Sequence, residues 1–345
     1  MKTFHFAVLA ALVSLCSCQK DPIKTAFSPE DGSEPVEISV NIASKGMTRA
    51  AGADELKVNS LQVFVFRTDA AFAGKREAYA SVSASTADLK ITTGPRRIYA
   101  LVNAPSLSSV ATEEAFLAAK SQLVDNSEGS LVMLGSTGAT AVNVSPTNHT
   151  FTIEVAHICA KIALGTVKVN FDDVAYAGKT FEVTRAYLAN VAGETNYSLS
   201  ATPSATTYWY NQNIASANPI AAAKATLIQE DFTGKSVTLT SGSDSNISLA
   251  RAYYAYPNTA AKLNSSSWAP QQTKLVIEAK VDGIACAYPV SLGNLARNTS
   301  YAVNLTVHRL GVDPDNPWED VEVNTCTITV SPVDWVAGAA VSEEI

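Results

Sequence analysis

Alternation of apolar and polar residues is the feature that most limits what this chain can fold into. Val36, Ile38, Val40 and Ile42 are separated by single polar residues, which is the period of a half-buried β-strand. Further segments that favour strands are residues 61–66, 80–83, 97–105, 131–134, 151–155, 156–164, 166–171, 181–183, 186–190, 237–239, 253–257, 274–279, 284–288 and 297–307. So many short strands predict a mainly all-β protein.

One segment favours a helix instead. Thr112 can cap its first turn, Glu113 and Glu114 suit the positive end of the helix dipole, and apolar residues follow as far as Leu123. A single helix does not change the fold class. The sequence predicts two tandem Greek-key β-sandwich domains with a minor helix in the N-terminal domain.

The length of 345 residues fits two domains at about 150 residues each. Alternation restarts near Cys159, which predicts an N-terminal β-sandwich domain over residues 50–158 and a C-terminal one over residues 159–345. Only three cysteines lie beyond residue 20, too few for a disulfide framework.

Charge excludes one class of partner. The chain has 25 basic and 32 acidic residues, a formal net charge of −7, and only 17% of its residues are charged. A nucleic-acid-binding surface needs concentrated positive charge, so no nucleic acid partner is expected. Ala, Ser, Thr and Asn take the place of charged residues, which suits a protein outside the cell.

The first 18 residues predict export. An uncharged apolar run from Phe4 to Leu15 has the length of a signal peptide and is too short to span a bilayer of about 30 Å. The Leu-Cys-Ser-Cys sequence that ends at Cys18 is similar to a bacterial lipobox, so Cys18 is the predicted lipidation site. The alternative is an ordinary secretory signal with two incidental cysteines.

Two segments flank the alternating run at residues 36–42. Residues 19–35 contain three prolines and few large apolar groups, which predicts an extended tether. Residues 43–52 are small and include Arg49, so they suit proteolysis after that residue.

No constellation of residues indicates catalysis. None of the four histidines stands with cysteines or carboxylates at zinc spacing, and residues 233–236 lack the upstream glycine of a phosphate-binding loop. No nucleophile elbow occurs. The sequence therefore predicts no enzyme, no cofactor and no metal site, and the acidic residues within 313–320 favour a solvated turn over a Ca²⁺ loop.

Aromatic residues leave one binding alternative open. Tyr208, Trp209 and Tyr210, together with Trp268, can form a stacking platform for a sugar. The competing interpretation is that these side chains pack in the core or at its rim.

Specific segments give the chain a resemblance to a known family. They are the lipobox at Cys18, the strands Val63–Phe66 and Ile98–Ala104, the element Ala160–Ile162, the segment Leu295–Leu305, and a late Val333–Trp335. In this order they resemble the FimA/Mfa-like fimbrillins, the subunits of type V pili of Bacteroidales. Where that family often has a basic residue before the Ala-Lys-Ile element, this chain has His157.

The resemblance implies a structural subunit, most simply of the pilus stalk, that mediates adhesion or biofilm formation. Members of the family reach the outer membrane as lipoproteins, and an Arg-specific or trypsin-like protease then removes the N-terminal strand. A strand from another copy replaces it. The implied partners are other copies in a head-to-tail polymer, tip and anchor subunits, the protease, and the outer membrane through the lipid anchor.

Carried onto this chain, the resemblance makes residues 19–49 the propeptide and Arg49–Ala50 the cleaved bond. The removable strand carries Val36, Ile38, Val40 and Ile42. The implied locations are the cell outer membrane before processing and an extracellular fimbrium after it.

Two alternating sets near the C-terminus can supply the replacement strand. The later set is the predicted donor, with Trp335 as its largest anchor, and comprises Val333, Trp335, Ala337, Ala339 and Val341. The earlier set, Cys326, Ile328 and Val330, is predicted to form a strand of the subunit itself.

Three alternatives remain open on the sequence. The strand at residues 36–42 can be a permanent first strand that never leaves. The protein can also be a monomeric surface lipoprotein that binds glycans near Tyr208, or a tip or anchor subunit instead of a stalk subunit.

Overall fold

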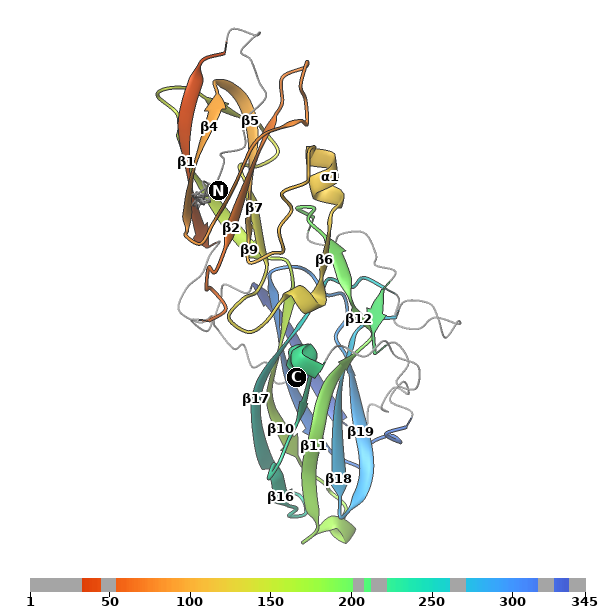
Figure 1. Ribbon diagram of the computed structural model, residues 1–345. Coiled ribbons are helices and arrows are strands. Elements are labelled where there is room, and N and C mark those ends of the chain that lie inside the picture. The colour runs from red at the N-terminus through yellow and green to blue at the C-terminus, as the bar shows by residue number, and fades with distance from the viewer. Residues whose placement is uncertain are drawn as a thin grey trace, which may run out of the picture.

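The computed structural model describes residues 33–44, 54–200, 208–211, 222–260, 271–315 and 326–334. Strands dominate this part of the chain and its helices are short, which confirms the predicted mainly all-β class (Figure 1). No helix among these residues has the length and apolar character needed to cross a membrane.

The first half of the chain forms one eight-stranded sheet. Its strands are β1 (Pro35–Ser44), β2 (Leu61–Arg67), β3 (Arg76–Val82), β4 (Thr86–Thr92), β5 (Gly94–Val102), β7 (Met133–Ser136), β8 (Val142–Val144) and β9 (Thr150–His157). Their order across the sheet is β3-β2-β5-β7-β9-β1-β4, and β8 pairs beside β5. The first strand of the chain is therefore an inner strand of the sheet.

The sheet curls around one apolar core, in the upper part of Figure 1. Alternate residues of β1, β2, β4, β5 and β9 point into this core, as their period of two predicts. The opposite side of β2 carries Phe64 and Phe66, whose rings lie 4.7 and 6.0 Å from the ring of Phe116. Strand β2 is buried on both faces, which explains its apolar run Val63–Phe66.

Helix α1 (Glu113–Ala118) is shorter than the predicted helix. Thr112 caps it as expected, because its Oγ1 accepts the backbone N–H of Ala115 at 3.2 Å. The predicted continuation to Leu123 is wrong: Ala119 has an extended backbone, and β6 (Lys120–Gln122) pairs with β13 (Glu194–Asn196). Strand pairing over a distance overrides the local helix preference here.

Two more sheets form the second half. The order β17-β10-β20-β21 joins β17 (Ser245–Ala255), β10 (Ala160–Val169), β20 (Thr299–Val307) and β21 (Cys326–Asp334). The order β15-β11-β18-β19 joins β15 (Gln229–Asp231), β11 (Thr180–Ala189), β18 (Lys274–Val281) and β19 (Ile284–Ser291), with β16 (Ser236–Thr238) also on β11. Inward-facing residues of both sheets share one apolar core, as in a β-sandwich.

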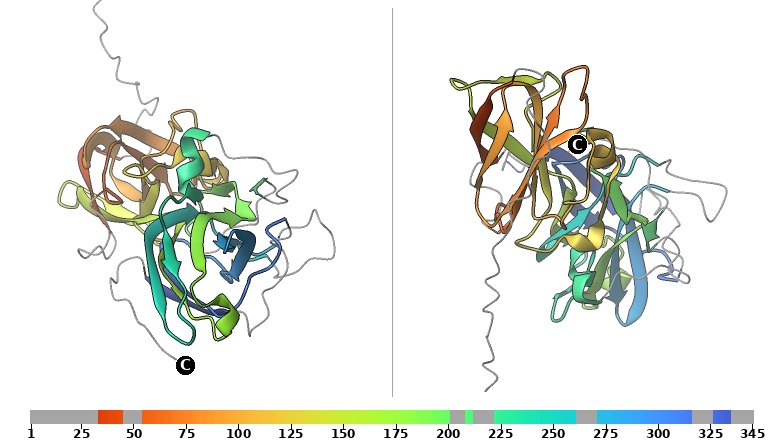
Figure 2. Two further views of the ribbon diagram at one scale, coloured as in Figure 1. Left: turned by 90° about the horizontal axis from the view of Figure 1, so that it is seen from below. Right: turned by 45° about the horizontal axis from the view of Figure 1, so that its top comes forward.

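Short elements connect these sheets. They are the two-stranded pair of β12 (Val191–Ala192) and β14 (Trp209–Tyr210), and the 3-10 turns η1 (Leu123–Asp125), η2 (Val174–Tyr176) and η3 (Ala222–Leu227). The strands of the two halves stay in separate groups in the further views of Figure 2. The change of sheet falls between β9, which ends at His157, and β10, which begins at Ala160. The domain limits 50–158 and 159–345, and the Greek-key connectivity, stay predictions.

The segment after α1 joins the two halves. Phe116, Leu123 and Leu131 belong to an apolar cluster that contains Phe64 and Phe66 of β2 as well as the core residues of the second half. The hydroxyl of Tyr256 lies 2.8 Å from the Ser121 hydroxyl and accepts a hydrogen bond from the Asn126 amide at 2.9 Å. These contacts fix the first half of the chain against the sandwich of the second half.

A second joint is polar and centres on Glu55. Its Oε1 lies 2.7 Å from Lys161 Nζ of β10 and accepts the Tyr254 hydroxyl of β17 at 2.7 Å. Its carbonyl oxygen lies 2.9 Å from His157 Nε2, and the backbone N–H of His157 donates to Asn298 Oδ1 at 3.2 Å. The Ala-Lys-Ile element and the segment around Asn298, both noted in the sequence, therefore meet at this joint.

Burial gives this joint a pH dependence. His157 is 1% exposed, and its burial lowers the pKa of the imidazole below its usual value. A free histidine in the unfolded chain has a pKa of about 6.5, so below that pH the unfolded state takes up a proton that the folded state does not bind. Folding is therefore weakened as the pH falls below about 6.5.

We expect His157→Gln to reduce this loss. Glutamine can still donate its amide to the Glu55 carbonyl but does not titrate. Between pH 7.5 and 5.5, the free energy of unfolding of the wild type should fall by about 1 kcal/mol more than that of His157→Gln. Urea unfolding at both pH values measures the difference, and parallel curves for the two proteins would contradict the expectation.

Candidate functional site

The structure describes only some of the residues singled out in the sequence. Cys18, Arg49 and Ala50 lie outside the described residues, as do Trp268 and the later alternating residues Trp335, Ala337, Ala339 and Val341. Strand β1 is described in full and carries all four residues of the predicted removable strand. Val333 lies in β21, paired with Ser300 of the same chain. The site is therefore built here from β1 and its surroundings.

Strand β1 is hydrogen-bonded along both edges. Its residues 35–41 pair antiparallel with β4, from Pro35 opposite Thr92 to Asn41 opposite Thr86. Its residues 39–44 pair parallel with β9. In the part of the chain that the structure describes, β4 has no other ladder partner, so there β1 alone connects β4 to β9 through backbone hydrogen bonds.

Alternation decides which side chains of β1 are buried. Ile38 and Val40 are both 0% exposed, while Val36 and Ile42 are partly buried against the same core. Each apolar side chain removed from water in this way contributes about 1.5–3 kcal/mol when burial is complete. The inner face of β1 is thus a continuous part of the core.

The outer face and the two ends of β1 are fixed by polar contacts. Thr86 Oγ1 donates to Asn41 Oδ1 at 2.7 Å, and the N–H of Ile42 donates to the Ser85 carbonyl at 3.1 Å. At the start of the strand, the N–H of Glu34 donates to Thr93 Oγ1 at 3.0 Å, and the N–H of Thr93 donates to the Glu34 carbonyl at 2.8 Å.

This arrangement defines what would be exposed if β1 left. Unpaired backbone groups of β4 and β9 would face each other across a gap one strand wide, above an apolar floor. Such edges bind an added strand strongly, because main-chain hydrogen bonds supply affinity and alternate side chains supply selectivity. The geometry can therefore hold an extended segment with apolar residues at every second position.

The strand β21 lies at an edge of its sheet. Among the described strands it pairs only with β20, from Cys326 opposite Val307 to Asp334 opposite Thr299. Thr299 follows Asn298, which bonds to His157 at the joint between the two halves. Asp334, the last described residue of β21, therefore lies near that joint.

The aromatic platform considered for sugar binding is largely buried. Trp209 and Tyr210 are 5% and 4% exposed and belong to the core of the second half, while Tyr208 is 36% exposed. The Tyr208 and Tyr210 rings meet edge to face, with centroids 5.1 Å apart. Among the three described aromatics only Tyr208 is available for stacking.

Polar residues elsewhere form turns and internal bonds. Asp313 Oδ1 accepts the backbone N–H of Asp315 at 2.9 Å, as in a capped turn. Within the described ranges, no three His, Cys, Asp or Glu side chains gather in a way that could hold a metal ion. Cys159 and Cys286 are buried free thiols, and burial raises the pKa of each.

One of the two strands that pair with β1 was not predicted from the sequence. Strand β4 was not among the predicted strands, although Ala87, Leu89 and Ile91 alternate with Asp88 and Lys90. That alternation was the signal that could have found it. The sequence pattern does not indicate that β4 pairs with β1, or that the pairing is antiparallel.

The burial of β1 can be tested in the intact chain. Ile38→Ala removes a side chain that is 0% exposed, and large-to-small changes in a core cost about 2–5 kcal/mol. Glu37→Ala is the matched control, since Glu37 is the exposed neighbour on the same strand and its loss should change stability by less than about 0.5 kcal/mol. Urea unfolding gives both values, and equal effects of the two changes would contradict the placement of β1.

Comparisons with known proteins point to one family. The family model described as "Major fimbrial subunit protein (FimA)" matches residues 35–185, beginning at the first residue of β1. No curated protein matches the chain.

Solved structures share the fold at low sequence identity. A candidate cell adhesion protein from Bacteroides eggerthii is 19% identical with a TM-score of 0.63, covering 88% of this chain and 96% of that one. The fimbrilin FimA from Porphyromonas gingivalis is 15% identical with a TM-score of 0.59, covering 87% and 97%. The tip fimbrial protein Mfa3 from the same species is 12% identical with a TM-score of 0.50, covering 88% and 100%. The FimA model match and this shared fold confirm the resemblance of the chain to the FimA/Mfa-like fimbrillins.

Proposed function

We propose that this protein is a stalk subunit of a type V fimbrium that polymerises by exchange of its first strand. The observation that carries the proposal is the position of β1. It is the first strand of the chain, yet it lies inside its sheet, between β9 and β4. An inner strand that can be cut loose from the rest of the chain leaves a gap that a strand from another subunit can fill.

The segment that follows β1 contains the proposed cleavage site. Arg49 lies between Ser44, the last residue of β1, and Glu55, which is fixed at the joint between the two halves. Cleavage after Arg49 would separate β1 from the body of the protein while Glu55 still holds the new N-terminal end. The proposed maturation is export, lipidation at Cys18, transfer to the outer membrane and cleavage by an Arg-specific protease.

The segment after β21 is the proposed donor strand. Residues 335–345 are one residue longer than β1, which spans ten residues, and Trp335, Ala337, Ala339 and Val341 alternate as β1 does. The structure pairs Val333 within its own chain, so the free donor would begin at Trp335. A strand that enters a neighbour's gap connects subunits head to tail, and such a contact propagates as a filament because it does not close on itself.

Two alternatives are less well supported. A monomeric lipoprotein that binds glycans near Tyr208 would need exposed aromatic faces, but Trp209 and Tyr210 are buried. A tip or anchor subunit shares the fold, as the likeness to Mfa3 illustrates. The stalk role is preferred because the chain has both a separable first strand and an alternating tail. No catalytic role is proposed.

Polymerisation of the processed precursor tests the proposal. The precursor without its signal peptide is cut with an Arg-specific protease and analysed on SDS gels without boiling. We expect a ladder of SDS-resistant oligomers. Burial of Trp335 and Val341 contributes about 1.5–3 kcal/mol each, the two alanines add less, and backbone pairing along both edges of the gap adds to the joint. Complete cleavage with only monomer remaining would rule the proposal out.

Three variants assign the parts of the mechanism. Arg49→Ala should remain uncut and monomeric, whereas Lys45→Ala removes the neighbouring base and should form the ladder as the wild type does. Truncation after Asp334 keeps β21 intact and should allow cleavage without a ladder. A normal ladder from the truncated protein would show that residues 335–345 are not the donor.

A further inference from the structure

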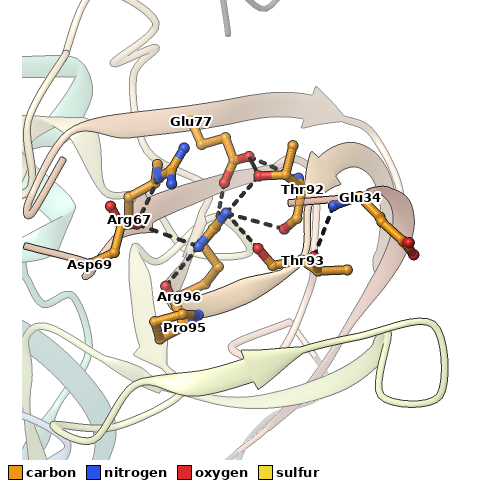
Figure 3. A network of polar contacts seen from close by, with 8 residues as sticks. All are labelled: Glu34, Arg67, Asp69, Glu77, Thr92, Thr93, Pro95 and Arg96. Carbon is orange, nitrogen blue, oxygen red and sulfur yellow. Dashed lines mark hydrogen bonds and ion pairs between the residues drawn. The ribbon is translucent and has the colours of Figure 1, made fainter. Parts of the chain in front are cut away.

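A buried ion pair lies at the end of β4. Arg96 of β5 and Glu77 of β3 have side chains that are 0% and 2% exposed, and Arg96 Nε donates to Glu77 Oε2 (Figure 3). A buried pair of charges is tolerated only when its remaining donors and acceptors are also bonded. Here those bonds go mainly to Thr92, the last residue of β4, and to Thr93 after it.

Both side chains of the ion pair hold this turn. Arg96 Nη2 donates to the carbonyl oxygens of Thr92 and Thr93 at 3.2 and 3.3 Å, and to the Thr92 hydroxyl at 2.7 Å. Glu77 Oε1 accepts the backbone N–H of Thr92 at 2.8 Å and its hydroxyl at 2.7 Å. The end of β4 is thus fixed by charge-assisted hydrogen bonds, which are the stronger kind.

These bonds do not depend on β1. Strands β3 and β5, which carry Glu77 and Arg96, pair with the two edges of β2. Strand β4, in contrast, has β1 as its only ladder partner within the described ranges. Arg96 and Glu77 therefore connect β4 to the part of the sheet that stays complete when β1 is absent.

Residues 83–85 and Thr93 join β4 covalently to β3 and β5, but no ladder of hydrogen bonds among the described residues holds it beside them, so without the side-chain bonds β4 could shift and close the gap. Because β1 is antiparallel to β4 and parallel to β9, the strands β4 and β9 run antiparallel to each other and could pair directly. Closure would shift β4 sideways by about one strand spacing, 4.8 Å. A shift of that size would break the bonds to Thr92 and leave the remaining donors and acceptors of the buried ion pair unsatisfied, which is costly.

We propose that the Arg96–Glu77 pair keeps the gap between β9 and β4 open after β1 has left, so that an incoming strand can enter. This inference rests on the proposed strand exchange and names the residues that position the acceptor groove. The same pair holds Thr93, whose N–H and Oγ1 bond to the backbone of Glu34 while β1 is present. The N–H and Oγ1 of Thr93 would then be in place to form hydrogen bonds with the backbone at the start of the incoming strand.

Uptake of a labelled first strand tests this inference directly. The full precursor is cut after Arg49 and incubated with an excess of a fluorescent synthetic peptide of residues 33–44, and uptake is measured by native mass spectrometry. We expect the wild type to take up the peptide. Arg96→Gln and Glu77→Gln should bind it at least about tenfold more weakly, because each breaks charge-assisted bonds to the turn.

Arg97→Gln is the matched control. Arg97 is the next residue on β5, but its guanidinium pairs with Glu113 of α1 at 2.6 Å and does not touch β4. Its peptide uptake should equal that of the wild type. Equal uptake by Arg96→Gln and the wild type, or no uptake by the wild type, would overturn the inference.

Two further measurements separate other causes. Thr92→Val removes only the hydroxyl shared by Arg96 and Glu77, so weaker uptake by this variant supports the inference even if Arg96→Gln fails to fold. Hydrogen exchange of the uncut variants reports whether β2 and β5 are intact. If the wild type takes up the peptide but forms no oligomer ladder, the proposal of strand exchange between subunits is wrong. The proposed role of Arg96 and Glu77 in holding the gap open would still stand.

Discussion

The need to pair every buried backbone group governs this structure. Strand β1 satisfies the facing edges of β9 and β4 at once, so the sheet of the first half is complete only while some strand occupies that place. The core depends on the same strand, since Ile38 and Val40 are fully buried in it. The proposed exchange of strands is consistent with this requirement. The place between β9 and β4 must hold a strand, but any segment with a suitable alternating sequence can supply it.

Local patterns predicted the parts of the fold that depend on period alone. The patterns at residues 36–42 and 297–307 predicted β1 and β20, and the cap at Thr112 predicted the start of α1. The end of α1 could not be found in this way, because it is set by the pairing of β6 with β13, more than seventy residues away. The sequence of one strand says little about which other strand it will pair with.

Polar residues within strands were harder still to interpret. Arg96 and Arg97 are neighbours on β5. Nothing in the sequence shows that Arg96 is buried against Glu77 while Arg97 is partly exposed and pairs with Glu113. For Trp209 and Tyr210 the sequence left a sugar platform open beside packing in the core or at its rim, and the structure shows both buried. In each case the role of the side chain depends on which segments the fold brings beside it, and a pattern along one chain does not contain that information.

The two-sided pairing of β1 also has a mechanical consequence. A strand held along both edges and pulled along its own axis loads all of its hydrogen bonds together, in shear. A strand peeled from one edge would instead lose its bonds one at a time, at much lower force. A fibre whose subunits were joined by a strand in the place of β1 would therefore resist stretching by flow, and its weakest direction would be sideways to the strand.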